Sequence, residues 1–406
     1  MRQIGRDNLE DIAIGAAVLG TGGGGDPYIG KLMAQHAIDQ HGPVTLLDPS
    51  EISDDDLIIP SAMMGAPTVM VEKIPAGHEF VRSFQALEAH MGRKAKATMS
   101  IEAGGLNSTT PFIVAATLGI PLVDCDGMGR AFPEIQMLTP TLFGVSATPM
   151  ALADEKGNTC LINTINNRWT ETIARTITID MGCSSMIALY AMSGKQIKEA
   201  CVLGTMSLAE KIGHEIRAAR RLHLDGVETV LRVTGGFKLF TGKVSDIARR
   251  TETGFARGDV TITGIGEDVG STLWIQFQNE FLVAKKDDQL IATVPDLITL
   301  LDAETGEPIT TEHIRYGFRV VVISIPCDPK WRTKAGLEIV GPHYFGYDVE
   351  FVPIEQRMAT KATNAAKAAK TESAGRAGKS TKTDKTEPAA KARKSSKASP
   401  SAKAGK

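Results

Sequence analysis

Cysteine is scarce in this 406-residue sequence, which contains only five. The count is odd, no two cysteines form a CxxC pair, and they are scattered over positions 125, 160, 183, 201 and 327. Disulfide frameworks and cysteine zinc sites need an even or closely spaced set. The sequence therefore indicates neither kind of site.

Long apolar runs are missing as well. No stretch approaches the roughly 20 apolar residues that cross a bilayer, and the N-terminal MRQIGRDNLE lacks the apolar segment of a secretory signal. We expect a cytoplasmic protein without a membrane partner. The sequence also has no HExxH, no GxSxG and no P-loop lysine, so the common signatures of zinc proteases, serine hydrolases and P-loop nucleotide binding do not apply.

Charge is distributed unevenly behind a net charge of −2. From Lys361 onward the chain has 13 basic and 3 acidic residues and no aromatic or large aliphatic side chain. Such a segment cannot bury enough surface to fold, so we expect residues 359–406 to be a disordered basic tail. It could contact nucleic acid weakly, non-specifically and in a salt-dependent way, or serve only as a solvated extension.

The remaining chain is long enough for two domains. Short apolar runs at 44–47, 57–64, 97–101 and 122–123 alternate with helical patterns at 79–91 and 110–118. This order predicts an α/β domain over residues 1–166 with a mainly parallel, doubly wound sheet. After a hairpin at 152–165 and helices near 168–179 and 205–222, the runs VETVLRV, FKLFTGKV, STLWIQFQ, EFLVA and GFRVVVISI predict a mainly antiparallel β domain over 167–358. Its many strand edges make a homo-oligomer plausible.

The segment GTGGGGDP at residues 20–27 is the densest glycine run. It formally satisfies the dinucleotide pattern GxGxxG, but that pattern requires a preceding strand, whereas residues 8–19 have helical spacing. Asp26 is a good N-cap and Pro27 suits the first position of a second helix, which we expect to reach about Gln40. We therefore expect no nucleotide. The run is either a tight turn or one wall of a small-ligand site, contributed by Gly22, Gly23, Gly24 and Gly25.

Polar residues follow the predicted parallel strands, where ligands bind in such sheets. Asp124 and Asp126 end one strand and Glu102 ends another. Paired carboxylates can act as general acid and base or hold a divalent cation, and an ion-pair and turn network is the structural alternative. We predict Asp124, Asp126 and Glu102 as catalytic candidates, with Asp124 and Asp126 as the ligands if a metal is bound. Gly65, Gly104, Asn107 and Arg130 complete the predicted substrate-binding set.

Several longer motifs occur in one order: AIGAAVLGTGGGGDPYIG, GAPTVMVEK, EAGGLNS, PLVDCDGMGRAFPE, GTMSLAEKIG, FQNEFLVA and VPDLI. Together they resemble the S-methyl thiohydantoin desulfurase family over about residues 5–355. The resemblance implies hydrolysis of a small cyclic substrate, S-methyl thiohydantoin, to hydantoin and methanethiol. Because members often occur beside hydantoinase/oxoprolinase proteins, a non-catalytic partner or subunit of such an enzyme is the alternative function.

Overall fold

The structure is a computed structural model that describes residues 1–25, 27–65, 69, 73, 75–252 and 255–363. Contacts divide the chain into one unit from Met1 to Met358 and another from Ala359 to Lys406, and the description below concerns the first. The expected disorder of the tail and the expected cap at Asp26 lie almost entirely outside the described residues. Among the helices of the described part, none is both long and apolar enough to cross a membrane.

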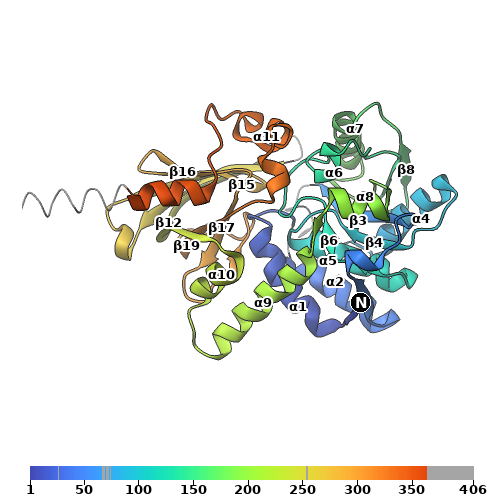
Figure 1. Cartoon of the computed structure of the whole chain (residues 1–406), viewed down its shortest axis with the longest axis horizontal. Coiled ribbons are helices and arrows are strands. Elements are labelled where there is room, and N and C mark those ends of the chain that lie inside the picture. Colours follow the sequence, from blue (N-terminus) through green and yellow to red (C-terminus); the bar gives the residue numbers. More distant parts are fainter. Residues whose placement is uncertain (26, 66–68, 70–72, 74, 253–254, 364–406) are drawn as a thin grey trace, which may run out of the picture. The chain divides into compact units, whose positions relative to one another are not determined.

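A nine-stranded mixed sheet forms the α/β part of the unit (Figure 1). Its centre is parallel, with strands in the order β2, β5, β4, β3, and antiparallel strands extend it on both sides. The strands are β1 (Arg2–Ile4), β2 (Val44–Leu47), β3 (Leu57–Gly65), β4 (Ala97–Ser100), β5 (Leu122–Val123), β7 (Met150–Ala153), β8 (Thr159–Ile162), β9 (Ser184–Ala188) and β10 (Met192–Ser193). The predicted α/β class is confirmed, and the sheet is more mixed than its first strands suggest because β9 and β10 join it from beyond residue 166.

Helices cover both faces of this sheet. Successive residues of β3 show why: Ile58 belongs to the apolar core on one face and Ile59 to the core on the other, and both are fully buried. A strand buried on both faces needs a continuous apolar run rather than an alternating one. The helices of this part are α1 (Arg6–Leu19), α2 (Pro27–His41), α4 (His78–Met91), α5 (Gly105–Leu118), α6 (Thr139–Leu142), α7 (Asn167–Asp180) and α8 (Gly194–Ala200).

The second part is an eight-stranded antiparallel sheet, as predicted. Its strands are β12 (Phe237–Glu252), β13 (Phe255–Gly264), β14 (Thr272–Gln278), β15 (Glu280–Lys286), β16 (Gln289–Thr293), β17 (Leu297–Asp302), β18 (Pro308–Ile309) and β19 (Arg319–Ile325). Helix α11 (Lys334–Val340) follows. Helix α9 (Thr205–Arg221) and helix α10 (Gly226–Thr234) precede the sheet, and a short ribbon of β6 (Cys125–Asp126) and β11 (Val202–Leu203) lies before α9.

One predicted strand, VETVLRV at residues 227–233, is wrong. The segment forms α10, whose first turn is capped by the Asp225 side chain accepting a hydrogen bond from the Glu228 amide (3.0 Å). Val227 and Val230, three residues apart, are its buried apolar side chains. Because a valine-rich run also fits the apolar stripe of a helix, the β-branched content misled the prediction and the cap decided the outcome.

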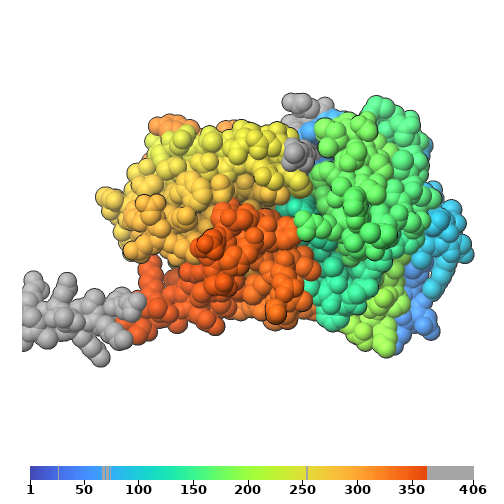
Figure 2. Space-filling model, turned by 90° about the horizontal axis from the view of Figure 1, so that it is seen from above, coloured from blue at the N-terminus to red at the C-terminus, as the bar shows by residue number. Residues whose placement is uncertain are grey.

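Hydrogen bonds join the two parts of the unit, which lie beside each other in the view of Figure 2. The Thr299 hydroxyl donates to the carbonyl of Val18 at the end of α1 (2.8 Å). The Phe281 amide donates to the Thr21 carbonyl in the glycine run (2.8 Å). The glycine run is therefore a junction between the α/β part and the β part.

Candidate functional site

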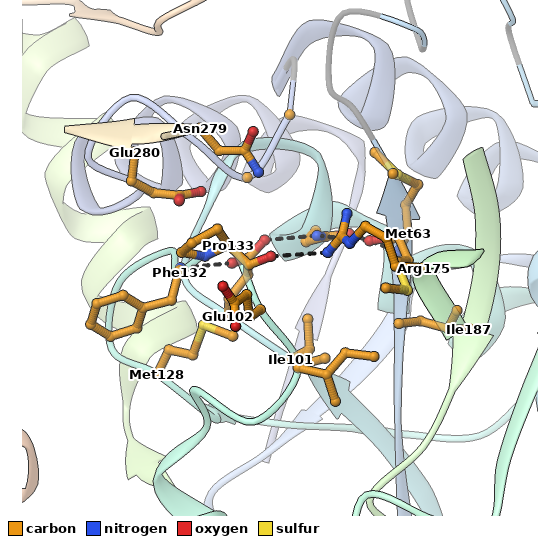
Figure 3. Close-up of a pocket in the computed structure, with 17 residues that line it drawn as sticks. Met63, Ile101, Glu102, Met128, Phe132, Pro133, Arg175, Ile187, Asn279 and Glu280 are labelled. Atoms are coloured by element: carbon orange, nitrogen blue, oxygen red, sulfur yellow. Dashed lines mark hydrogen bonds between the residues drawn. The ribbon is translucent and has the colours of Figure 1, made fainter. Parts of the chain in front are cut away.

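A pocket opens where the ends of β3 and β4 meet the turn between β14 and β15 (Figure 3). The space between its lining residues that is free of protein atoms is about 520 Å³, a volume that includes space open to solvent. Its lining comes from both parts of the unit: Gly24, Gly25, Met63, Met64, Gly65, Ile101, Glu102, Asn107, Met128, Phe132, Pro133, Glu134, Ile135, Arg175, Ile187, Asn279 and Glu280.

Glu102 lies just past the end of β4 and is held in one orientation. The Asn107 amide donates to its Oε1 (2.7 Å), and the Phe132 backbone amide donates to its Oε2 (3.3 Å). Asn107 is itself fixed, because its Oδ1 accepts from the Met63 amide (2.8 Å) and its Nδ2 also donates to the Met63 carbonyl (3.2 Å). Burial raises the pKa of Glu102 to about 7, although the hydrogen bonds that it accepts from Asn107 and Phe132 oppose the rise.

Glu280 faces the same pocket from the first position of β15. The preceding residue, Asn279, has a left-handed backbone (φ 59°) that turns the chain from β14 into β15. Its Oδ1 accepts from the Ala256 amide (2.9 Å), which holds the turn against β13. The Oε2 of Glu280 is buried and has no hydrogen-bond partner among the described residues. Burial first, and then the charge of Glu102, raise the pKa of Glu280 well above its ordinary value.

Arg175 brings a cation to the pocket from α7. Its Nε donates to Glu171 Oε1 (2.6 Å) and its Nη2 to the Pro133 carbonyl (3.0 Å), and the guanidinium lies 4.3 Å from the centre of the Phe255 ring. Burial raises the pKa of Glu171, while the neighbouring Arg175 opposes the rise. The remaining wall is apolar and is formed by Met63, Ile101, Met128, Phe132 and Ile187. The pocket thus has an acidic side and an apolar side.

The glycine run is used in two ways. Gly24 and Gly25 line the pocket, and their carbonyls accept hydrogen bonds from the first amides of α5, Asn107 and Leu106 (3.2 and 3.3 Å). Gly22 and Gly23 instead pack against β15: a Cβ on Gly23 would lie 2.0 Å from Glu280 Oε1, and one on Gly22 would lie 2.5 Å from the Phe281 ring. The helix predicted before the run is α1 and the helix predicted after it is α2, so no strand precedes the glycines.

Asp124 lies outside the pocket lining. Its Oδ1 accepts from the Met206 and Ser207 amides at the start of α9 (2.9 and 3.1 Å), and the Ser207 hydroxyl donates to its Oδ2. These are the free amides that every helix N-terminus presents. In this position Asp124 acts as a cap supplied from 82 residues away in the sequence.

Asp126 also lies outside the lining and is fully buried. Its Oδ2 accepts from the Met128 and Gly129 amides (2.9 and 2.8 Å), and its Oδ1 has no partner among the described residues. Burial raises the pKa of Asp126 to about 7. Across the described residues, no three His, Cys, Asp or Glu side chains gather in a way that could hold a metal ion.

Arg130 is placed between the two parts of the unit rather than in the pocket. Its guanidinium donates to the carbonyls of Pro295 (2.7 Å) and Asp296 (2.9 Å) and to the Thr21 hydroxyl (2.9 Å). Burial lowers its pKa to about 10, and the charge of Glu280 opposes this shift most strongly. The side chain is completely buried, and its hydrogen bonds connect the loop before β17 to the glycine run.

Of the predicted site residues, the pocket brings together Glu102, Asn107, Gly24, Gly25 and Gly65. Gly104 packs behind it, where a Cβ would lie 3.0 Å from both the Ala131 side chain and the Gly24 backbone. Sequence reasoning missed Asn279, Glu280 and Arg175. Asn279 and Glu280 stand in the motif FQNEFLVA, where an Asn-Glu pair interrupts two apolar strands, and this interruption is the signal that could have identified them.

The fold and pocket define a protein with an α/β part, an antiparallel β part, and two buried carboxyl groups, one from each part, at a shared small-molecule pocket. Two family models match the chain, the S-Me-THD-like N-terminal domain over residues 7–164 and the S-Me-THD-like C-terminal domain over residues 165–354. The chain therefore belongs to the S-Me-THD-like family, and the resemblance stated from the motifs is confirmed.

A solved structure shares this fold. It is the crystal structure of a protein from Chromobacterium violaceum, which is 25% identical and superimposes with a TM-score of 0.72 over 87% of this chain and 100% of that one. No curated protein matches the sequence.

Proposed function

We propose that this chain is a hydrolase that converts an S-methyl thiohydantoin to the hydantoin and methanethiol. The observation that supports the proposal is the pair of buried carboxyl groups, Glu102 and Glu280, at one pocket in a member of the S-Me-THD-like family. Two acids whose pKa values differ because their surroundings differ are a common basis for acid–base catalysis. Here Glu102 is fixed by two donors, whereas one oxygen of Glu280 has no described donor.

In the first half of the reaction, the Glu102 carboxylate takes a proton from water while the water oxygen bonds to the ring carbon that carries sulfur. The electron pair of the carbon–nitrogen double bond moves to the ring nitrogen, which receives the proton of neutral Glu280. A pKa near 7 leaves a substantial fraction of Glu102 ionised at neutral pH. Burial and the charge of Glu102 raise the pKa of Glu280, which favours its protonated form.

In the second half, the carbon–sulfur bond breaks with its electron pair on sulfur. Glu102 gives its proton to the departing thiolate, and Glu280 takes the proton of the new hydroxyl as the carbonyl forms. The products are methanethiol and the hydantoin, and both carboxyl groups regain their starting states. These two side chains therefore accept and return every proton that the reaction moves.

The rest of the pocket suits a small ring. We assign the ring to the polar side, beside the backbone of Gly24, Gly25 and Gly65, and the methylthio group to the apolar wall of Met63, Met128 and Ile187. We assign Asp124, Asp126, Arg130, Gly22, Gly23 and Gly104 to holding the site in shape.

The test is release of methanethiol from a synthetic S-methyl thiohydantoin by the purified full-length chain, followed with a thiol reagent, with the hydantoin identified by mass spectrometry. Glu102→Gln and Glu280→Gln should each lower kcat by about 100-fold or more, the range that positioned acids and bases supply. Glu79→Gln is the matched control, because Glu79 is equally buried but lies outside the pocket. No release above buffer by the wild type, or full activity in both pocket variants, would exclude this function.

A further inference from the structure

The outward stripe of α7 is unusual for a surface helix. Trp169 and Ile173 are 50% and 38% exposed, Ile179 is 44% exposed, and Thr172 and Thr176 lie exposed between them. These positions follow one another at helical spacing, so they form one continuous surface about 15 Å long at 1.5 Å per residue. A solvent-exposed helix face normally carries charged side chains along its length, and this one carries none between its ends.

The only charged side chains on this exposed stripe are at its two ends, and their signs are the reverse of what an isolated helix favours. Arg168 lies in the first turn and Asp180 in the last, while the first turn has no acid and the last turn no base. A cation near a helix N-terminus and an anion near its C-terminus both oppose the helix dipole. Neither side chain forms an ion pair within the described residues, although Arg168 lies 5.9 Å from the Tyr344 ring.

A second copy of α7, packed antiparallel, accounts for both features. With the two-fold axis at position 174, Arg168 of one copy lies level with Asp180 of the other, and the reverse pair forms at the other end. The same register places Trp169 level with Ile179, and Thr172 level with Thr176. Trp169 and Ile179 thus meet as an apolar pair at each end, and the small threonines lie near the centre, where the helices must approach most closely. A two-fold interface requires this kind of self-complementarity.

The surface continues past the helix, which a stable dimer needs. Beside the N-terminal half of α7 lies a groove of mixed character. Its larger apolar side chains are Val145, Ile165, Trp169, Ile339 and Tyr344, and the rest of its lining is mainly polar: Gln136, Thr141, Gly144, Ser146, Asn166, Asn167, Arg168, Thr172 and Glu338. Phe143 and Ile165 are 52% and 85% exposed. In the antiparallel arrangement the C-terminal end of the partner's α7 lies over this groove. Helix α7 lies at the top of the view in Figure 1, and the green surface of that part of the chain is turned toward the viewer in Figure 2.

We propose that this face is a homodimer interface in which α7 packs antiparallel against α7 of a second copy of the chain. The inner face of the same helix carries Arg175, which lines the pocket, and Glu171, which accepts a hydrogen bond from it, so dimerisation would hold a helix that the pocket also uses. The proposal stands on the surface alone and does not depend on the catalytic function.

The test is sedimentation equilibrium of the full-length chain over a concentration series, with circular dichroism and melting temperature as checks of folding. The wild type should reach a dimer, and Thr176→Arg, which places two like charges close to the axis, should be monomeric at every concentration with an unchanged fold. Arg168→Asp and Asp180→Arg should each raise the dissociation constant by about tenfold, and the double variant should restore it.

Glu199→Arg is the matched control, an exposed charge reversal on α8 that should leave the dissociation constant unchanged. Restoration by the double variant is the decisive result, because a parallel helix pair or a different interface cannot produce it. A monomeric wild type, a dimer that tolerates Thr176→Arg, or a double variant no tighter than the single ones would each overturn the proposal.

Discussion

Replacing Gly23 by alanine should damage catalysis more than folding. The added Cβ would lie 2.0 Å from Glu280 Oε1, 2.6 Å from its Cδ and 2.7 Å from its Cγ. Ordinary contact begins at 3.4 Å, so the carboxyl group must move by about 1.4 Å. The obstacle is the end of a side chain that can rotate, and the structure does not place Gly23 in a left-handed backbone conformation, so the chain can yield by displacing Glu280.

Misplacement of a reacting group by about 1 Å costs on the order of 100-fold in rate. We therefore expect Gly23→Ala to lower kcat for methanethiol release about 100-fold, equivalent to about 2.7 kcal/mol in the activation barrier, while unfolding in urea changes by about 1 kcal/mol or less. Gly24→Ala gives the contrast. Its Cβ would meet the Gly104 backbone at 2.6 Å, and its φ is +82°, so it should lose about 2–4 kcal/mol of unfolding free energy.

Gly5→Ala serves as the control, because its Cβ meets no other atom closer than 3.8 Å. Both kcat and the unfolding free energy should remain close to wild type in that variant. Wild-type kcat in Gly23→Ala, or unfolding of Gly23→Ala as severe as that of Gly24→Ala, would refute the reasoning that Gly23 makes room for the catalytic position of Glu280.

Four further predictions concern the pocket, the junction and the tail. The folded-state pKa of Glu102 is raised from 4.5 to about 7, so the contribution of this group to stability is fully present below pH 4.5 and is lost as the pH rises through 7. At pH 8, Glu102→Gln should therefore be more stable than the wild type in urea unfolding, by at most about 3 kcal/mol. At pH 4 the two proteins should be equally stable. Asn107→Ala removes a donor that lowers the same pKa, so the acidic limb of the pH–rate profile should move to higher pH, and an unmoved limb would argue against Glu102 as the base. Arg130→Met leaves four buried acceptors without their donor, the carbonyls of Ala131, Pro295 and Asp296 and the Thr21 hydroxyl, and should cost about 3–5 kcal/mol of unfolding free energy in urea. Deleting residues 361–406 should leave turnover and melting temperature unchanged while weakening binding to nucleic acid at low salt, and a shifted melting temperature would contradict that reading of the tail.

The local features of this fold were predictable from the sequence because they depend on neighbours along the chain. The helices on both sides of the glycine run, the strands at 44–47, 57–64 and 97–101, and the hairpin at 152–165 all follow from periodicity and turn residues. The exception, α10, was decided by a cap at Asp225, which a count of β-branched residues does not register.

The site was predictable only where it is local. Glu102, Gly104 and Asn107 lie within seven residues of the end of β4, and Glu102 and Asn107 share the pocket. In the sequence alone, Asp124 and Asp126 are as good candidates for catalytic acids as Glu102. Asp124 differs from Glu102 because its carboxylate accepts hydrogen bonds from the amides at the start of α9. This contact joins residues 82 positions apart, so the local sequence does not reveal it. Glu280 reaches the pocket from another sheet, and no spacing in the sequence encodes that approach.

Because Gly23 lies so close to Glu280, substitutions in two segments that are distant in the sequence are expected to depend on each other. A side chain at position 23 fits only if residue 280 is shorter or moves away, so a change at position 23 alters where the side chain of residue 280 can lie. The α/β part and the β part therefore cannot be exchanged freely between relatives or expressed as separate working halves. A chimera that takes its glycine run from one family member should also take the Asn-Glu turn from the same one.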